Sequence, residues 1–152
     1  MARQYSLSIA DSANIAGVFN SYILANSLAT TRLWVTEVGI GSNTDGANSQ
    51  EVVLATQTAT DAGGLALTPQ LMDTLDPSAA TTAREGTATA FTTLAATSTI
   101  LDFGINQRAT FRYIFQPGRE AKFNKATNVG AVLYPKLVSS PFACTAMLII
   151  EE

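Results

Sequence analysis

Short apolar and β-branched segments, each bounded by turn-forming residues, follow one another along this chain. The clearest are Arg32–Val38, Glu51–Gln57, Phe111–Phe115, Ala131–Tyr134 and Ala143–Ile150. β-Branched and aromatic side chains fit a pleated sheet, and short strands with regular turn signals are typical of sandwiches and barrels. The sequence therefore predicts an all-β protein, a β-sandwich with a jelly-roll-like topology.

Helix signals are weak by comparison. The chain has 20 threonines, which favour strands, and most of its 24 alanines lie beside threonine, serine or glycine rather than in a helical stripe. Asn14–Leu28 has helical spacing of apolar residues, but two short strands fit this segment as well. The connection Leu67–Glu85 predicts turns or single helical turns, and long connections are normal in jelly rolls. Gln116–Arg119 is a turn signal, and Pro135 should mark a strand edge.

The length fits one domain. A chain of 152 residues with 47% hydrophobic residues can bury a sizeable core, and neither a repeat nor a linker divides it. We expect a single β-sandwich domain over residues 1–152.

Composition excludes several kinds of chemistry. The chain has no histidine and a single cysteine, Cys144, so serine–histidine catalysis, histidine-liganded zinc and an intramolecular disulfide are excluded within it. Cys144 lies in an apolar strand and should be an inert core residue. No fixed pair of carboxylates or phosphate-binding loop is present either. We expect no enzyme activity and no cofactor or metal.

Charge is sparse and uneven. Only 14% of residues are charged, against roughly 25% on average. Residues 1–102 carry three cations and nine acids, a net charge of −6, whereas residues 103–150 carry six cations and one acid, a net charge of +5. This uneven charge distribution has two explanations: solvated charges on strands and loops, or an electrostatic contact surface. The overall charge of −3 argues against nucleic acid as the main partner.

Other motifs have ordinary structural explanations. Asn43–Gly46 lacks the glutamate of a calcium loop and reads as a turn, as does Gly63–Gly64. Trp34 should be a core anchor, with an interface role as the second choice. No apolar run is long enough to span a membrane, and residues 1–10 lack the features of a signal peptide.

Four stretches carry a resemblance to small virion proteins of tailed phages. Leu67–Asp73 with Leu75–Ala80 resembles their "TPQ…LDPADPAA" stretch, and Ile105–Tyr113 resembles "LNQRATFRW". Pro117–Glu120 is similar to a "PGGEL" turn, and Ile149–Glu152 to an "FEE" ending. The likeness covers residues 33–152, and it departs at Arg119, where the family has glycine, and at Tyr113, where it has tryptophan.

This resemblance implies a capsid decoration or cement protein: a small β-sandwich that sits on the capsid surface of a virion assembled in the host cytoplasm. Its partners would be the major capsid protein and its own copies, commonly as a trimer, without a membrane. Residues 1–32 match nothing in the family, so they are either part of the sandwich or an N-terminal arm that docks elsewhere.

The basic region 108–125 supplies the candidate contact residues of this reading. They are Arg108, Arg112, Arg119, Lys122 and Lys125, with Phe111, Tyr113 and Phe115 expected in the core. The alternative function is a receptor- or glycan-binding β-sandwich of a phage tail or fibre. It needs exposed aromatic rings, for which Tyr5, Tyr22 and Tyr134 are the candidates.

Overall fold

The computed structural model of the chain describes residues 2–14, 23–27, 30–42, 49–57, 65–85, 96–106, 108–124, 130–137 and 142–152. Across these ranges the protein is built from strands and turns and contains no helix. All strand pairs are antiparallel and form two sheets, which confirms the predicted all-β sandwich.

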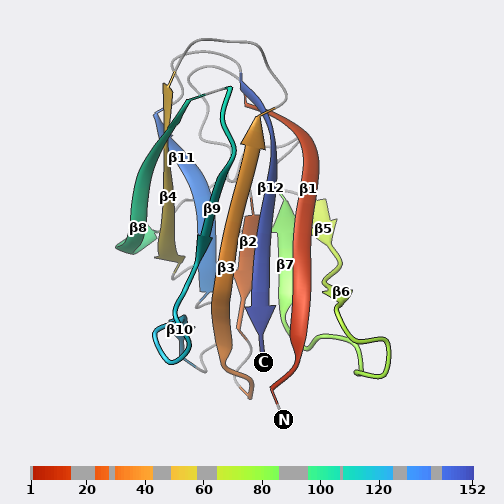
Figure 1. Cartoon of the computed structure of the whole chain (residues 1–152). Coiled ribbons are helices and arrows are strands. Elements are labelled where there is room, and N and C mark those ends of the chain that lie inside the picture. Colours follow the sequence, from red (N-terminus) through yellow and green to blue (C-terminus); the bar gives the residue numbers. More distant parts are fainter. Residues whose placement is uncertain are drawn as a thin grey trace.

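The first sheet, called sheet A here, faces the reader in Figure 1. Its strand order is β10-β3-β12-β1-β6, and β9 also pairs with β3. Its strands are β1 (Gln4–Asn14), β3 (Leu33–Ser42), β6 (Gln70–Leu71), β9 (Phe111–Ile114), β10 (Ala121–Phe123) and β12 (Phe142–Glu151).

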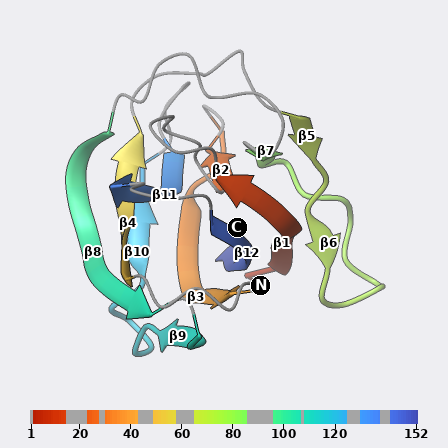
Figure 2. The ribbon, with the colours of Figure 1, turned by 90° about the horizontal axis from the view of Figure 1, so that it is seen from above.

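The second sheet, sheet B, has the order β5-β7-β2-β11-β4-β8. Its strands are β2 (Ile23–Asn26), β4 (Ser49–Gln57), β5 (Leu65–Leu67), β7 (Thr82–Glu85), β8 (Ala96–Asn106) and β11 (Gly130–Leu137). Figure 2 shows β8 and β9 on the same side of the sandwich, with β6 on the opposite side. On the β8–β9 side the rings of Phe103 and Phe111 stack with centroids 3.8 Å apart.

The strand pairs are nested along the sequence: the first and last strands pair with each other, and strands nearer the middle of the sequence pair inside them. β1 pairs with β12, β2 with β11, β3 with β9 and β10, and β4 with β8. A long hairpin folded in this way, with its strand pairs distributed between two sheets, is a jelly roll. β5, β6 and β7 belong to the connection between β4 and β8; β5 and β7 extend sheet B, and β6 extends sheet A. The connection Leu67–Glu85, all of which the structure describes, therefore contains short strands and turns, and the single helical turns expected there are not formed.

The main core fills the space between the sheets, because buried apolar residues alternate along their strands. Tyr5 and Leu7 from β1, Leu148 and Ile150 from β12, and Leu54 from β4 are all fully buried in it. Sheet B also buries its other face. A second cluster, comprising Leu24, Val53, Ala55 and Val132 with Tyr134 packed against them, lies on that side.

Two described segments of residues 1–32, namely 4–14 and 23–26, are strands of the two sheets. Of the segment Asn14–Leu28, residues 23–26 form a strand paired with β7 and β11, so the strand alternative holds there, while residues 15–22 and 28 lie outside the described residues. Residues 4–14 form an inner strand between β12 and β6, whereas an N-terminal arm would lie outside the sheets.

Trp34 is not a core anchor, because it lies between the inward-facing Leu33 and Val35 and so points to the outer face of sheet A, half-buried. Cys144 is fully buried, as expected for a core residue. The turns Asn43–Gly46 and Gly63–Gly64 lie outside the described residues.

Candidate interaction surfaces

One candidate surface is the β9–β10 edge, residues 111–123. β9 and β10 pair with β3 one after the other and in the same direction, so they form a single edge strand interrupted by Phe115–Glu120. The interruption contains the predicted turn, in which the Arg119 N–H donates to the Gln116 carbonyl at 2.8 Å. Gly118 has φ of +85° there, which identifies a type II turn with Pro117 before it.

Two cations of this edge are balanced within the chain. The guanidinium of Arg112 makes a two-pronged hydrogen bond with the Glu37 carboxylate, at 2.5 and 2.9 Å, and this bond raises the pKa of Arg112. The Lys122 ammonium lies 3.9 Å from the Glu120 carboxylate and 5.9 Å from the centre of the Trp34 ring. Arg112 and Lys122 therefore each make contacts within the protein, in addition to any contact with a partner.

Arg119 differs from these two. It is exposed at the end of the turn, and its guanidinium has no ion-pair partner among the described residues. Arg108 is exposed in a separate turn, where its N–H donates to the Asn106 side chain, and Lys125 lies outside the described residues. The structure thus brings Arg112, Arg119 and Lys122 to one edge of sheet A.

Beside Arg119 the edge is hollowed. Tyr113, Ile114, Phe115 and Gln116 line this hollow with Arg119, and its volume is about 350 Å³. Tyr113 is 41% exposed and Ile114 57%, and the Tyr113 and Phe115 rings meet edge to face with centroids 4.9 Å apart. The prediction that Tyr113 is a core residue is therefore wrong: β9 is an edge strand, which leaves the ring open to solvent. Phe111 and Phe115 do pack, half-buried, against the main core.

A second surface, the Leu75 loop (residues 71–80), follows β6 on the opposite side of sheet A. Its apolar side chains point into solvent: Leu75 is 91% exposed, Met72 56%, and Leu71 is also exposed. Sequence reasoning predicted turns in this part of the connection Leu67–Glu85, but it did not predict that the loop forms an exposed apolar surface. The signal it missed is a leucine placed between two aspartates, Asp73 and Asp76, in a turn.

Local hydrogen bonds fix the tip of this loop. The Asp73 carboxylate accepts from the Leu75 N–H at 2.9 Å, and the Asp73 carbonyl accepts from the Asp76 N–H at 3.1 Å. These bonds close a turn around Leu75, so its side chain is presented from a defined backbone.

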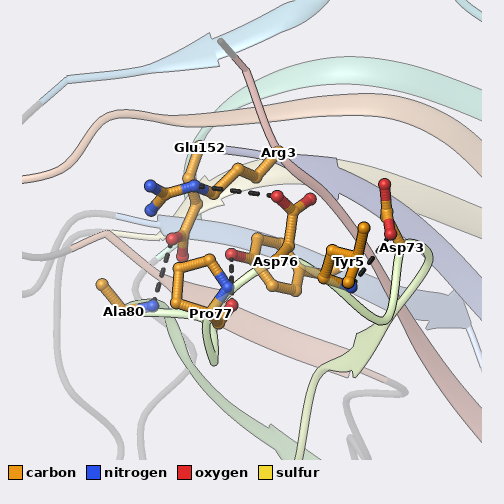
Figure 3. Close-up of polar contacts among 8 residues, drawn as sticks. Arg3, Tyr5, Asp73, Asp76, Pro77, Ala80 and Glu152 are labelled. Atoms are coloured by element: carbon orange, nitrogen blue, oxygen red, sulfur yellow. Dashed lines mark hydrogen bonds and ion pairs between the residues drawn. The ribbon is translucent and has the colours of Figure 1, made fainter.

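Contacts with both ends of the chain fix the base of the loop (Figure 3). The Tyr5 hydroxyl donates to the Pro77 carbonyl at 3.0 Å, and the Arg3 guanidinium lies 4.0 Å from the Asp76 carboxylate. The Glu152 carboxylate accepts from the Ala80 N–H at 3.0 Å and from the next N–H along the chain at 2.5 Å. The loop is therefore anchored to β1 and to the residue after β12.

Neither of the two described aromatic candidates of the glycan-binding alternative, Tyr5 and Tyr134, is exposed. Tyr5 is fully buried in the main core, and Tyr134 is half-buried against the second cluster. Tyr22 lies outside the described residues. Neither described ring offers an open face for stacking on a sugar.

Among the described residues, histidine, cysteine, aspartate and glutamate nowhere gather in groups of three that could hold a metal ion. No helix long and apolar enough to cross a membrane occurs in the described part of the chain.

Comparison with known proteins adds no relative. No family model matches the chain, and neither the curated proteins nor the solved structures give a significant match.

Proposed function

We propose that this protein is a structural virion protein of a bacteriophage, a capsid decoration or cement protein that stabilises the shell through protein–protein contacts. Its partners are the major capsid protein and further copies of itself. The observation that carries the proposal is a pair of exposed apolar surfaces, the Leu75 loop and the β9–β10 edge, on a jelly-roll sandwich.

Exposed apolar side chains are informative when they gather. Seven large hydrophobic side chains are exposed among the described residues, and five of them belong to the two surfaces. These five are Leu71, Met72, Leu75, Tyr113 and Ile114. Gathered apolar surface flanked by polar groups is the usual signature of a protein-binding site. The resemblance to phage virion proteins names the setting in which such a site would act.

The mechanism requires contact area and no bond chemistry. Each bound copy would bury on the order of 1,000 Å² or more of surface against the shell and its neighbours. Many such copies raise the free energy needed to separate capsid subunits, because their contacts must break together. The low charge of the chain suits this work, since charged residues are depleted at the centres of interfaces.

Location on the particle tests the proposal. An antibody raised against the purified protein should label the head of virions of the phage that encodes it, as seen by immunogold electron microscopy. Labelling of the tail or fibre would instead support the receptor-binding alternative, and absence from intact virions would overturn the proposal.

Occupancy on the shell tests the basic contact residues. Arg119→Glu should reduce the number of copies bound per capsid, because Arg119 is exposed and has no ion-pair partner among the described residues. The matched control is Arg32→Glu, the same charge change at an exposed residue outside both surfaces. Arg112 is a poorer choice for this test, since its reversal would place two carboxylates together at Glu37. Equal occupancy of Arg119→Glu and wild type would argue against this contact.

A further inference from the structure

We infer that the Leu75 loop and the β9–β10 edge are the two halves of one contact between copies of this chain. Leu75 of one copy enters the hollow of the next copy that Tyr113, Ile114 and Arg119 line. The inference rests on the proposed function for its biological setting, and it identifies the self-contact that this function requires.

The apolar parts of the two surfaces match as knob and hollow. Leu75 projects from a turn and is 91% exposed, whereas the hollow, of about 350 Å³, has room for a leucine side chain. The hollow walls are the exposed Tyr113 and Ile114 with Phe115. Docking would therefore remove apolar surface from water on both sides, which is the main driving force of association.

The charges of the two surfaces are opposite. Two carboxylates, Asp73 and Asp76, flank Leu75. Asp76 lies 4.0 Å from the Arg3 guanidinium, whereas Asp73 has no ion-pair partner among the described residues. On the other surface, Arg119 stands at the rim of the hollow and lacks an ion-pair partner among the described residues. An aspartate of the loop can thus meet the Arg119 guanidinium when Leu75 is seated, which fixes the orientation of the contact.

Both surfaces are ordered before they meet. The Asp73 turn and the Tyr5 and Glu152 contacts hold the loop, while the type II turn at Gly118 shapes the hollow. Binding between preformed surfaces loses less conformational entropy than binding that must first order a loop. The free energy of the apolar contact is then available for association.

Their places on the fold decide the kind of assembly. β6 and β10 are the two ends of the path through sheet A, so the loop and the hollow lie at opposite edges of that sheet (Figure 1), and Met72 of the loop and Ile114 of the edge both line a groove of about 410 Å³ between them. A contact between two different surfaces is head-to-tail, and it generates a closed ring or an open filament rather than a two-fold dimer. Copies of this chain should therefore join in a directional series.

Disulfide trapping tests this arrangement directly. Thr74→Cys places a thiol on the loop and Gln116→Cys places one at the hollow, and both positions are exposed. Under mild oxidation, a mixture of the two single variants should give a covalent dimer, whereas each variant alone should not. Ser98→Cys on β8, also exposed, replaces Gln116→Cys in the control mixture, and Cys144 is buried. The inference would be overturned if the mixture of Thr74→Cys and Gln116→Cys gave no more dimer than the control mixture. It would also be overturned if either variant alone formed a covalent dimer.

The mass in solution provides a second test. Wild-type protein should form oligomers whose mass rises with concentration in sedimentation velocity, and Leu75→Ser and Arg119→Glu should each weaken this association about tenfold or more. Ile100→Ser, at an exposed residue of β8, is the control and should associate like wild type. If Leu75→Ser and wild type associate equally, the inference is wrong.

The two proposals fail separately. Crosslinked protein that is absent from virions would overturn the capsid function and leave the self-contact standing. Protein on capsids that gives no crosslink, and loses capsid binding in Leu75→Ser, would overturn the self-contact and assign the loop to the major capsid protein.

Discussion

The phenol of Tyr5, on the inner strand β1, donates a hydrogen bond to the carbonyl oxygen of Pro77 at 3.0 Å. The two residues are 72 positions apart in the chain. The Tyr5 ring is fully buried in the main core, so its hydroxyl links the interior of the sandwich to the exposed Leu75 loop. A core residue therefore sets the position of a surface that we propose to be an interface.

Tyr5→Phe should keep the packed ring and remove only this link. We expect the free energy of unfolding to fall by about 1 kcal/mol, the usual net value of one hydrogen bond, as measured by urea denaturation. The phenol also has a raised pKa, because burial and the nearby Glu152 carboxylate disfavour its ionised form.

A raised folded-state pKa gives this prediction a pH signature. The stabilisation by Tyr5 is complete below the unfolded-state value near 10.0 and is lost as pH rises through the higher folded-state value. Tyr5→Phe should thus lose less stability than wild type above pH 10. A variant with the same stability and the same alkaline profile as wild type would contradict the role assigned to the hydroxyl.

Glu152 should order the other end of the loop. Its carboxylate accepts hydrogen bonds from the Ala80 and Thr81 N–H groups, so Glu152→Ala should expose both amides and reduce stability by about 1 kcal/mol. Hydrogen exchange followed by NMR should show faster exchange at these two amides. Glu151→Ala, at the preceding residue, is the control, and equal protection in the two variants would refute the assignment.

The sandwich could be predicted from the sequence because its strands have strong local signals. Arg32–Val38 and Glu51–Gln57 are rich in β-branched residues, and all of them except Arg32 lie in β3 and β4. Gln116–Arg119 combines proline and glycine in the order that a type II turn needs. These features depend on neighbouring residues alone. The jelly-roll topology could not be predicted from these local signals alone. Its prediction also used the general rule that long connections are normal in jelly rolls.

The surfaces could be predicted only in part, because they depend on pairing between distant strands. Alternation placed Tyr113 correctly on the same face as Phe111 and Phe115, but only the edge position of β9 exposes its ring. Trp34 is likewise a residue type that is common in protein cores, but its position between the inward-facing Leu33 and Val35 turns its side chain outward. The pairing of Arg112 with Glu37, 75 residues away, has no local signal at all.

Part of the stability of the β9–β10 turn should depend on the ionised carboxylate of Glu120 and be lost in acid. Its carboxylate accepts from its own N–H and from the Gly118 N–H, and these bonds lower its pKa below the ordinary 4.5, with a smaller contribution from Lys122. A lowered folded-state pKa means that the stabilisation is present above pH 4.5 and is lost as pH falls through the folded-state value. An NMR titration should show the Gly118 amide shifting with this low pKa. Glu120→Gln should abolish that shift, and a Glu120 pKa at or above 4.5 would disprove the arrangement.

Gly130 begins β11 at a point where no side chain fits. A Cβ atom there would overlap the carbonyl oxygen of Ala25 on the paired strand β2, so Gly130→Ala must push the two backbones apart. We expect a loss of about 3 kcal/mol or more in the free energy of unfolding, measured by urea denaturation, since backbone pairing in sheet B has to yield. Gly104→Ala on β8 is the matched control, because a Cβ atom there meets nothing within 4 Å, and its stability should equal or slightly exceed that of wild type. Similar stabilities of the two variants would show that β2 and β11 are not paired in this register.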